Sequence, residues 1–154
     1  MAEVKGNKIR LEIVTPYSKV FDDMVDVCVL PTSDGEMGVM AGHLPMIVGL
    51  IPGLGHFKVD NDIRYCVYSE GYAEISKSFI RVICNSFEFP DEISVTMAVD
   101  SYLYFTELYK ADKNSRDAEL GIKRANVRIA AIERFGSTER KERLAELKAE
   151  KQIG

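Results

Sequence analysis

Residues 8–14 read K-I-R-L-E-I-V, and this stretch decides how the first half of the chain folds. Charged and aliphatic side chains alternate through it, with Ile9, Leu11 and Ile13 on one side. A period of two places one face of a strand on a core and the other face in water. The stretch therefore predicts a half-buried β-strand.

More short runs of strand-forming residues follow along the chain. Val25, Val27 and Val29 repeat the alternation before a proline ends the run. Three further runs, rich in aromatic and β-branched residues, are bounded by turn residues: 63–68, 72–75 and 79–84. Parallel strands need crossover connections of about a dozen residues or more, and these runs leave no room for them. The pattern predicts an antiparallel β-sandwich or barrel over residues 1–88.

The second half of the chain has the periodicity of helices. One apolar stripe, spaced by three and four residues, runs along residues 114–135: Ala118, Ile122, Ala125, Ile129 and Ile132. This spacing predicts a helix that Asn114 or Ser115 can cap and that Gly136 can end in the left-handed conformation. Many residues of the stripe are small, which lets a second helix approach closely.

Residues 91–110 form a second predicted helix, apolar on more than one face, although the β-branched residues in 93–99 leave a strand as an alternative. The short loop between the two segments predicts an antiparallel hairpin over residues 89–136. Residues 137–154 are mostly Glu, Lys, Arg, Leu and Ala, and we expect a loosely attached third helix or a frayed tail. The fold class is therefore α+β, mainly β.

Composition excludes several classes of function. The 154 residues carry a formal net charge of -4, which argues against a nucleic-acid binder. No apolar run approaches the ~20 residues of a membrane span, and the first residues lack the apolar core of a signal peptide, so we expect neither insertion nor secretion. Cys28, Cys66 and Cys84 lie in apolar runs and are expected to be reduced and buried. Residues 113–154, by contrast, hold 11 basic and seven acidic side chains.

Catalytic motifs are missing from the sequence. It has no phosphate-binding loop, no G-x-S-x-G and no C-x-x-C, and His43 and His56 are not at metal-ligand spacing. We therefore expect no catalytic residue, metal or cofactor, and an interaction or regulatory protein. A hydrolase that uses His43 with Cys28 or Asp34 is a rival. The loop at 33–45 is either a set of tight turns or a shaped surface that presents Glu36 and His43.

Several motifs resemble one family. The most specific are G-E-M-G-V at residues 35–39, G-H-x-P at 42–45 and L-I-P-G at 50–53. The run S-E-G-Y-A-E at 69–74 is similar to a hairpin of the same family, with Glu70 in place of a usual glycine. Together these segments resemble the epsilon subunit of bacterial F-type ATP synthases, strongly over residues 8–84 and in general character over the helical hairpin.

The resemblance implies a rotor subunit in the central stalk, which couples ion translocation to ATP synthesis. In that family a flattened β-sandwich binds the gamma subunit and the ring of c subunits. The protein would then lie peripherally on the cytoplasmic face of the cell membrane. The residues that the resemblance assigns to contacts with gamma or the c-ring are Glu36, Met37, His43 and Leu44.

In many bacteria the family's C-terminal helices fold down on the sandwich or extend into the catalytic head, where they block ATP hydrolysis. Four basic residues of the second predicted helix would there meet an acidic segment of the catalytic beta subunit: Lys123, Arg124, Arg128 and Arg134. The alternative for these four is a solvated charged face. The tail after Gly136 extends beyond the usual end of the family.

Some members of the family bind ATP through an I/L-D-x-x-R-A motif. Here the same register reads I-S-V-T-M-A over residues 93–98, so that Ser94 replaces the acid and Met97 replaces the arginine. A methionine cannot form charge-assisted bonds to phosphate, and we expect weak or no ATP binding. The main rival to the whole assignment is a non-catalytic β-sandwich adaptor with unrelated partners.

Overall fold

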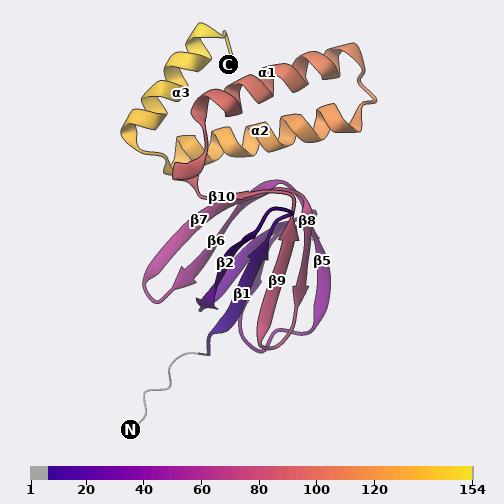
Figure 1. Ribbon diagram of the computed structural model, residues 1–154, viewed down its shortest axis with the longest axis vertical. Helices are drawn as coiled ribbons and strands as arrows, with labels where there is room; N and C mark the ends of the chain where they lie inside the picture. Colours follow the sequence, from indigo (N-terminus) through magenta and orange to yellow (C-terminus); the bar gives the residue numbers. More distant parts are fainter. Residues whose placement is uncertain (1–6, 154) are drawn as a thin grey trace. The chain divides into compact units, whose positions relative to one another are not determined.

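The computed structural model describes residues 7–153. The chain divides into two compact units, Met1–Phe87 and Glu88–Gly154, and each is described by itself. The first unit is built from β-strands, and the second holds three α-helices, which confirms the predicted fold class and the extra helix (Figure 1).

In the described part of the chain, ten strands make up one sheet that folds into a sandwich (Figure 1). The strands are β1 (Ile9–Val14), β2 (Lys19–Val25), β3 (Val27–Thr32), β4 (Gly35–Val39), β5 (Met46–Leu50), β6 (Gly53–Val59), β7 (Asp62–Tyr68), β8 (Gly71–Ile75), β9 (Phe79–Cys84) and β10 (Phe87–Glu88). Their order in the sheet is β10-β7-β6-β3-β5-β8-β9-β1-β2, and β4 pairs with β3.

One pair of neighbours departs from the antiparallel prediction. Strands β1 and β9 run parallel, with Leu11 opposite Ile80. The sequence argument required a crossover helix for a parallel pair, and that requirement was wrong. Because seven other strands lie between β1 and β9 in the sequence, the sandwich itself makes the connection.

The core of the first unit confirms the opening alternation. Ile9, Leu11 and Ile13 are fully buried, and Phe57 and Tyr68 are the largest of the other fully buried side chains. All three cysteines are buried, unpaired thiols. Burial raises the pKa of the Cys28 thiol to about 12 and that of the Cys84 thiol to about 11, so these thiols stay protonated and act as small apolar groups.

The alternation of Val25, Val27 and Val29 does not mark one strand with one buried face, as the sequence suggested. Val25 ends β2 and is buried, whereas Val27 and Val29 belong to β3 and are only half-buried. In β3 the core side chains are Cys28 and Leu30. Strands β2 and β3 pair with different strands of the sheet, so the alternation of buried and exposed residues does not continue from one to the other.

The second unit contains η1 (Pro90–Glu92), α1 (Val95–Ala111), α2 (Arg116–Phe135) and α3 (Thr138–Glu150). Helices α1 and α2 lie side by side as an antiparallel hairpin (Figure 1). A serine caps each α-helix by accepting a backbone hydrogen bond: Ser94, Ser115 and Ser137. Ser115, not Asn114, is thus the cap of α2, and the strand alternative for residues 93–99 is wrong.

Two glycines allow close contacts in the hairpin. A Cβ built on Gly121 would lie 2.3 Å from Cγ of Phe105, so α2 can meet the aromatic ring of α1 only without a side chain there. Gly136 has a φ of -68°, and the predicted left-handed end is wrong. Its Cβ would lie 2.5 Å from the Ile132 carbonyl oxygen, so the position needs a small residue for space.

The expectation of a loosely attached third helix is also wrong. Leu144 and Leu147 are buried, and the Lys148 Nζ lies 2.8 Å from Glu133 Oε1 on α2. Helix α3 therefore packs on the hairpin. Among residues 7–153, no helix is long and apolar enough to cross a membrane.

Candidate functional site

The hairpin of β3 and β4 presents Glu36 and Met37. In its turn the Thr32 hydroxyl donates to the Gly35 carbonyl at 2.7 Å and accepts from the Asp34 N–H at 3.3 Å. Gly35 has a φ of +111°, which side chains rarely adopt. The Glu36 side chain is exposed and that of Met37 is half-buried. The turn is therefore held in one shape and offers a carboxylate to solvent.

A second turn presents His43 and Leu44. Gly42, with a φ of +85°, donates its N–H to the Lys77 carbonyl at 2.8 Å, and His43 donates its own N–H to Met40 at 3.2 Å. The His43 Nδ1 lies 2.8 Å from the Leu44 carbonyl oxygen, which can only accept, so Nδ1 carries the proton. The Leu44 side chain is 76% exposed.

Sequence reasoning missed other apolar side chains along this surface. Met40 and Ile47 flank the second turn, and both are strongly exposed, Ile47 to 71%. With Leu44 and Met46 they put four exposed apolar side chains into eight consecutive residues. Exposed apolar groups gathered in this way are typical of a surface that meets another protein. Their signal in the sequence was the methionine-rich, turn-rich stretch itself.

The hydrolase alternative finds no support at these residues. Cys28 is fully buried and its raised pKa denies it the thiolate that nucleophilic attack requires. Asp34 lies exposed in its turn. Within residues 7–153 there is no group of His, Cys, Asp and Glu that could hold a metal ion.

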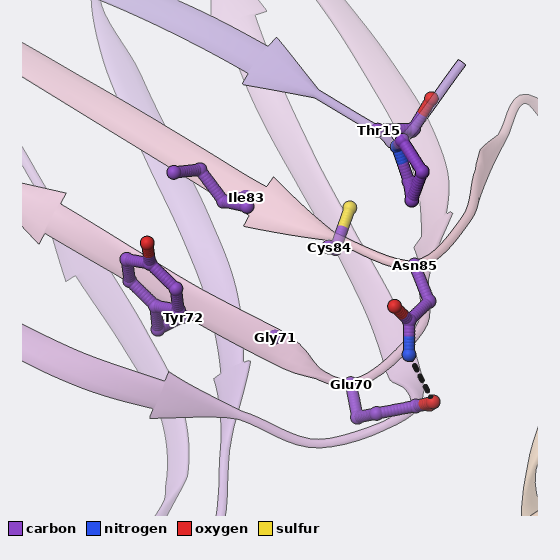
Figure 2. A pocket seen from close by; sticks show the side chains of 8 residues that line it. Thr15, Glu70, Gly71, Tyr72, Ile83, Cys84 and Asn85 are labelled. Atoms are coloured by element: carbon purple, nitrogen blue, oxygen red, sulfur yellow. Dashed lines mark hydrogen bonds between the residues drawn. The ribbon is translucent and has the colours of Figure 1, made fainter.

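A hollow of about 290 Å³ opens beside the turn between β1 and β2 (Figure 2). Its lining comes from that turn and from the facing ends of β8 and β9: Thr15, Pro16, Glu70, Gly71, Tyr72, Ile83, Cys84 and Asn85. Figure 2 shows the Asn85 side chain turned toward Glu70, to which it donates at 2.7 Å. A Cβ on Gly71 would lie 2.1 Å from the Ile83 carbonyl oxygen, so only glycine fits at this end of β8.

Tyr17 lies in the same turn as Pro16 and is 93% exposed. The turn is fixed by the Thr15 N–H, which donates to the Ser18 carbonyl at 2.9 Å. An exposed tyrosine next to an apolar hollow is a common anchor of protein interfaces. The sequence analysis did not identify this feature, although an aromatic residue between a proline and a serine in a tight turn could have signalled it.

The outer face of β1, β2 and β9 carries a network of charges. Glu12 lies within 3.6 Å of nitrogens of Arg10, Lys19 and Arg81, and Asp22 accepts two hydrogen bonds from Arg10 at 2.8 and 2.9 Å. The hydrogen bond from Arg81 lowers the pKa of Glu12, and those from Arg10 and Lys19 lower the pKa of Asp22. These cross-strand pairs depend on register, which the sequence did not reveal.

The four basic residues assigned to α2 do not form one cluster. Lys123 is exposed and lies 3.5 Å from Glu119, one turn earlier. Arg124 is half-buried, and desolvation lowers its pKa. The Arg134 guanidinium lies 5.1 Å from the centre of the neighbouring Phe135 ring.

Arg128 is engaged inside the second unit. Its Nε lies 2.9 Å from Glu88 Oε1 and its Nη2 donates to Oε2 at 3.1 Å. The two side chains are only 20% and 23% exposed. An ion pair this far from solvent is screened less than a surface pair. It therefore holds Arg128 of α2 to Glu88, the first residue of the second unit.

Ser94 and Met97, which replace the acid and arginine of the nucleotide motif, have a structural arrangement of their own. The Met97 N–H donates to the Ser94 hydroxyl oxygen at 3.2 Å, which caps α1. The Met97 side chain is exposed and offers no hydrogen-bond donor.

The fold defines a β-sandwich protein with a helical C-terminal unit. A family model described as ATP synthase, delta/epsilon chain, beta-sandwich domain, matches residues 8–90. An ATP synthase epsilon chain of Syntrophotalea carbinolica is 31% identical over 85% of this chain and 98% of its own length. One of Staphylococcus aureus strain Newman is 32% identical over 82% of this chain and 98% of its own.

A solved structure with the same fold is a chain of the Euglena gracilis mitochondrial ATP synthase. It has a TM-score of 0.69 and 19% identity, and the match covers 82% of each chain. The chain described here belongs to the epsilon family of ATP synthase subunits, which are non-catalytic subunits of the stalk.

Proposed function

We propose that this protein is a rotor subunit of an F-type ATP synthase, which helps couple ion translocation to ATP synthesis and inhibits ATP hydrolysis through its C-terminal helices. One observation carries the proposal. A sandwich that matches the family over residues 8–90 is followed in the same chain by the antiparallel helices α1 and α2. The protein would be held peripherally at the cytoplasmic face of the cell membrane by its partners.

The proposed partners of the sandwich are the gamma subunit and the c-ring. Glu36, Met37, His43 and Leu44 would make these contacts, from the two turns described above. The Thr32 hydroxyl fixes the first turn and backbone hydrogen bonds fix the second, each with a positive-φ glycine, so little conformational entropy is lost when a partner binds. The exposed Leu44 supplies apolar area, and Glu36 supplies a charge that a basic partner can meet.

This partner surface is tested by co-expression with the gamma subunit and the c-ring of the same organism, followed by size-exclusion chromatography with mass detection. The variant Leu44→Asp should weaken the assembly by about tenfold or more, since it puts a charge into an apolar contact. Ile63→Asp, at an exposed aliphatic residue of β7, is the matched control and should assemble normally. An intact assembly with Leu44→Asp would refute the surface, and no assembly of the wild-type chain would favour the unrelated adaptor.

The inhibitory contact would use the cations of α2 against an acidic segment of the catalytic beta subunit. Lys123 and Arg124 lie in the middle of the helix, and Arg134 lies in its last turn. Arg128 would first have to exchange Glu88 for the carboxylates of beta, so the intramolecular ion pair competes with the inhibitory one. Glu88→Gln weakens the internal partner and should therefore strengthen inhibition.

Inhibition is tested by removing the helices. Truncation after Phe89 should raise the ATPase activity of the assembled complex, and Glu88→Gln in the full chain should lower it. Asp91→Gln, at an exposed acid in the same linker, controls for the change of net charge. An unchanged activity after truncation would refute inhibition by the helices.

Nucleotide binding is not part of the proposed function. Ser94 caps a helix and Met97 offers no charge to a phosphate, so we expect no ATP affinity in the micromolar range. Isothermal titration calorimetry of the full chain with ATP decides the point, and a micromolar dissociation constant would contradict the proposal.

A further inference from the structure

Helix α3 contacts both α1 and α2, and its side chains bond to the segment before α1 and to Glu133 near the end of α2. Its two apolar anchors, Leu144 and Leu147, lie one turn apart and retain 1% and 6% of their exposure. Most of the other residues of the helix are charged. A helix of 13 residues is marginal alone in water, so its order depends on these contacts.

Arg140 joins α3 to the segment that leads into α1. Its Nη2 donates to the Pro90 carbonyl at 3.1 Å and also to the Ile93 carbonyl. These carbonyls belong to η1 and its C-cap, directly before α1 begins. Hydrogen bonds from a guanidinium are about twice as strong as those between neutral groups, and here both end on the connecting segment.

The C-terminal end of α3 is bonded to α2 and is capped by a backbone hydrogen bond. The Lys148 Nζ lies 2.8 Å from Glu133 Oε1, with the lysine side chain only 25% exposed. The Ile153 N–H then donates to the Lys148 carbonyl at 2.8 Å across Gln152, which adopts a φ of +57°. This is the geometry of a helix that ends at a defined residue.

We propose that α3 is an intramolecular latch, which keeps the connecting segment 88–94, α1 and α2 in one arrangement. The inference rests on the proposed function, in which the hairpin rearranges to inhibit hydrolysis. Any rearrangement that moves α1 away from the end of α2 exposes Leu144 and Leu147 and releases Arg140 from its two carbonyls. The latch therefore lowers the population of the rearranged state by the free energy of this contact.

The latch predicts an effect opposite in sign to that of the hairpin. Removing the whole hairpin by truncation after Phe89 abolishes inhibition and raises ATPase activity. Truncation after Gly136 removes only α3, frees the hairpin and should lower the ATPase activity of the assembled complex. Because the two truncations move the activity in opposite directions, failure of the latch and failure of the inhibitory function give different results.

The direct test measures hydrogen exchange in the full-length chain. Arg140→Gln should speed the exchange of the amides of residues 97–99 and 129–135 by about tenfold, equal to about 1.4 kcal/mol. Arg143→Gln removes the same charge from the exposed side of α3 and should leave the exchange unchanged. If Arg140→Gln does not fold, the truncation after Gly136 gives the same readout.

Equal exchange in Arg140→Gln and wild type would overturn the latch, as would a truncation after Gly136 that raises ATPase activity. If truncation after Phe89 leaves the activity unchanged while Arg140→Gln still speeds exchange, the latch stands as a conformational device and inhibition is refuted.

Discussion

Replacing Gly121 by alanine tests the packing on which the hairpin depends. In an exposed helix the change from glycine to alanine stabilises by about 1 kcal/mol. At Gly121, however, the new Cβ would lie 2.3, 2.4 and 2.5 Å from three carbons of the Phe105 ring. Carbon atoms prefer separations of about 3.5–4.0 Å, so the ring would have to retreat by about 1 Å or more.

Overpacking of this kind costs about 1–3 kcal/mol. Against the gain in helix propensity, we expect Gly121→Ala to destabilise the second unit by about 1 kcal/mol. In a chain that also carries Phe105→Ala the obstacle is gone, and Gly121→Ala should instead stabilise by about 1 kcal/mol. The sign of one substitution thus depends on the partner ring.

Hydrogen exchange of the α1 and α2 amides measures this free energy in the second unit alone, which is necessary because two units need not unfold together. The experiment is a double-mutant cycle of four proteins: the wild type, Gly121→Ala, Phe105→Ala and the double variant. A Gly121→Ala effect of the same sign and size in both backgrounds would refute the close contact.

Three further predictions concern the sandwich and a cap. Gly71→Ala should destabilise the sandwich by about 2 kcal/mol or more, because its Cβ meets the backbone carbonyl of Ile83 at 2.1 Å, and thermal unfolding measures the loss. The pKa of Asp22 is lowered by its hydrogen bond with Arg10, so the stability it adds is complete at neutral pH and is lost as the pH falls below about 4. The free energy of unfolding of Asp22→Asn should depend less on pH in that range than that of the wild type. Equal slopes against pH would refute the role of the pair. Ser115→Ala removes the cap of α2 and should cost about 1 kcal/mol in urea unfolding, whereas no change would show that the cap contributes nothing.

Local patterns predicted those parts of the fold that depend on neighbours in the sequence. The alternation of Ile9, Leu11 and Ile13 and the stripe of α2 are short-range signals, and the structure confirms them. The parallel pairing of β1 with β9 and the change of neighbours between Val25 and Val27 depend on which distant strand lies alongside. An alternation with a period of two indicates that a strand has a buried and an exposed face. It does not indicate which other strand pairs with it.

The candidate surfaces also divide into those that a local motif predicted and those that depend on distant segments. The motif at 35–39 led to a turn that has Gly35 at a positive φ and is bonded by the Thr32 hydroxyl. Tyr17 and the hollow beside it, by contrast, arise from three separate segments and had no single motif. Gly136 is informative because the residue type was right for the wrong reason. Glycine at a helix end usually supplies a positive φ, whereas here it supplies room next to the Ile132 carbonyl.

Charge counting shows most clearly what only the structure can add. Residues 113–154 hold 11 basic side chains, and the resemblance assigns four of them on the second helix to an acidic partner without distinguishing among the four. In the structure Arg128 is paired with Glu88, and Arg140 is bonded to two backbone carbonyls. Both arginines hold the segment before α1 in place. The basic segment therefore stabilises one arrangement of the helices with part of its charge, and these two arginines can reach another subunit only by giving up those contacts.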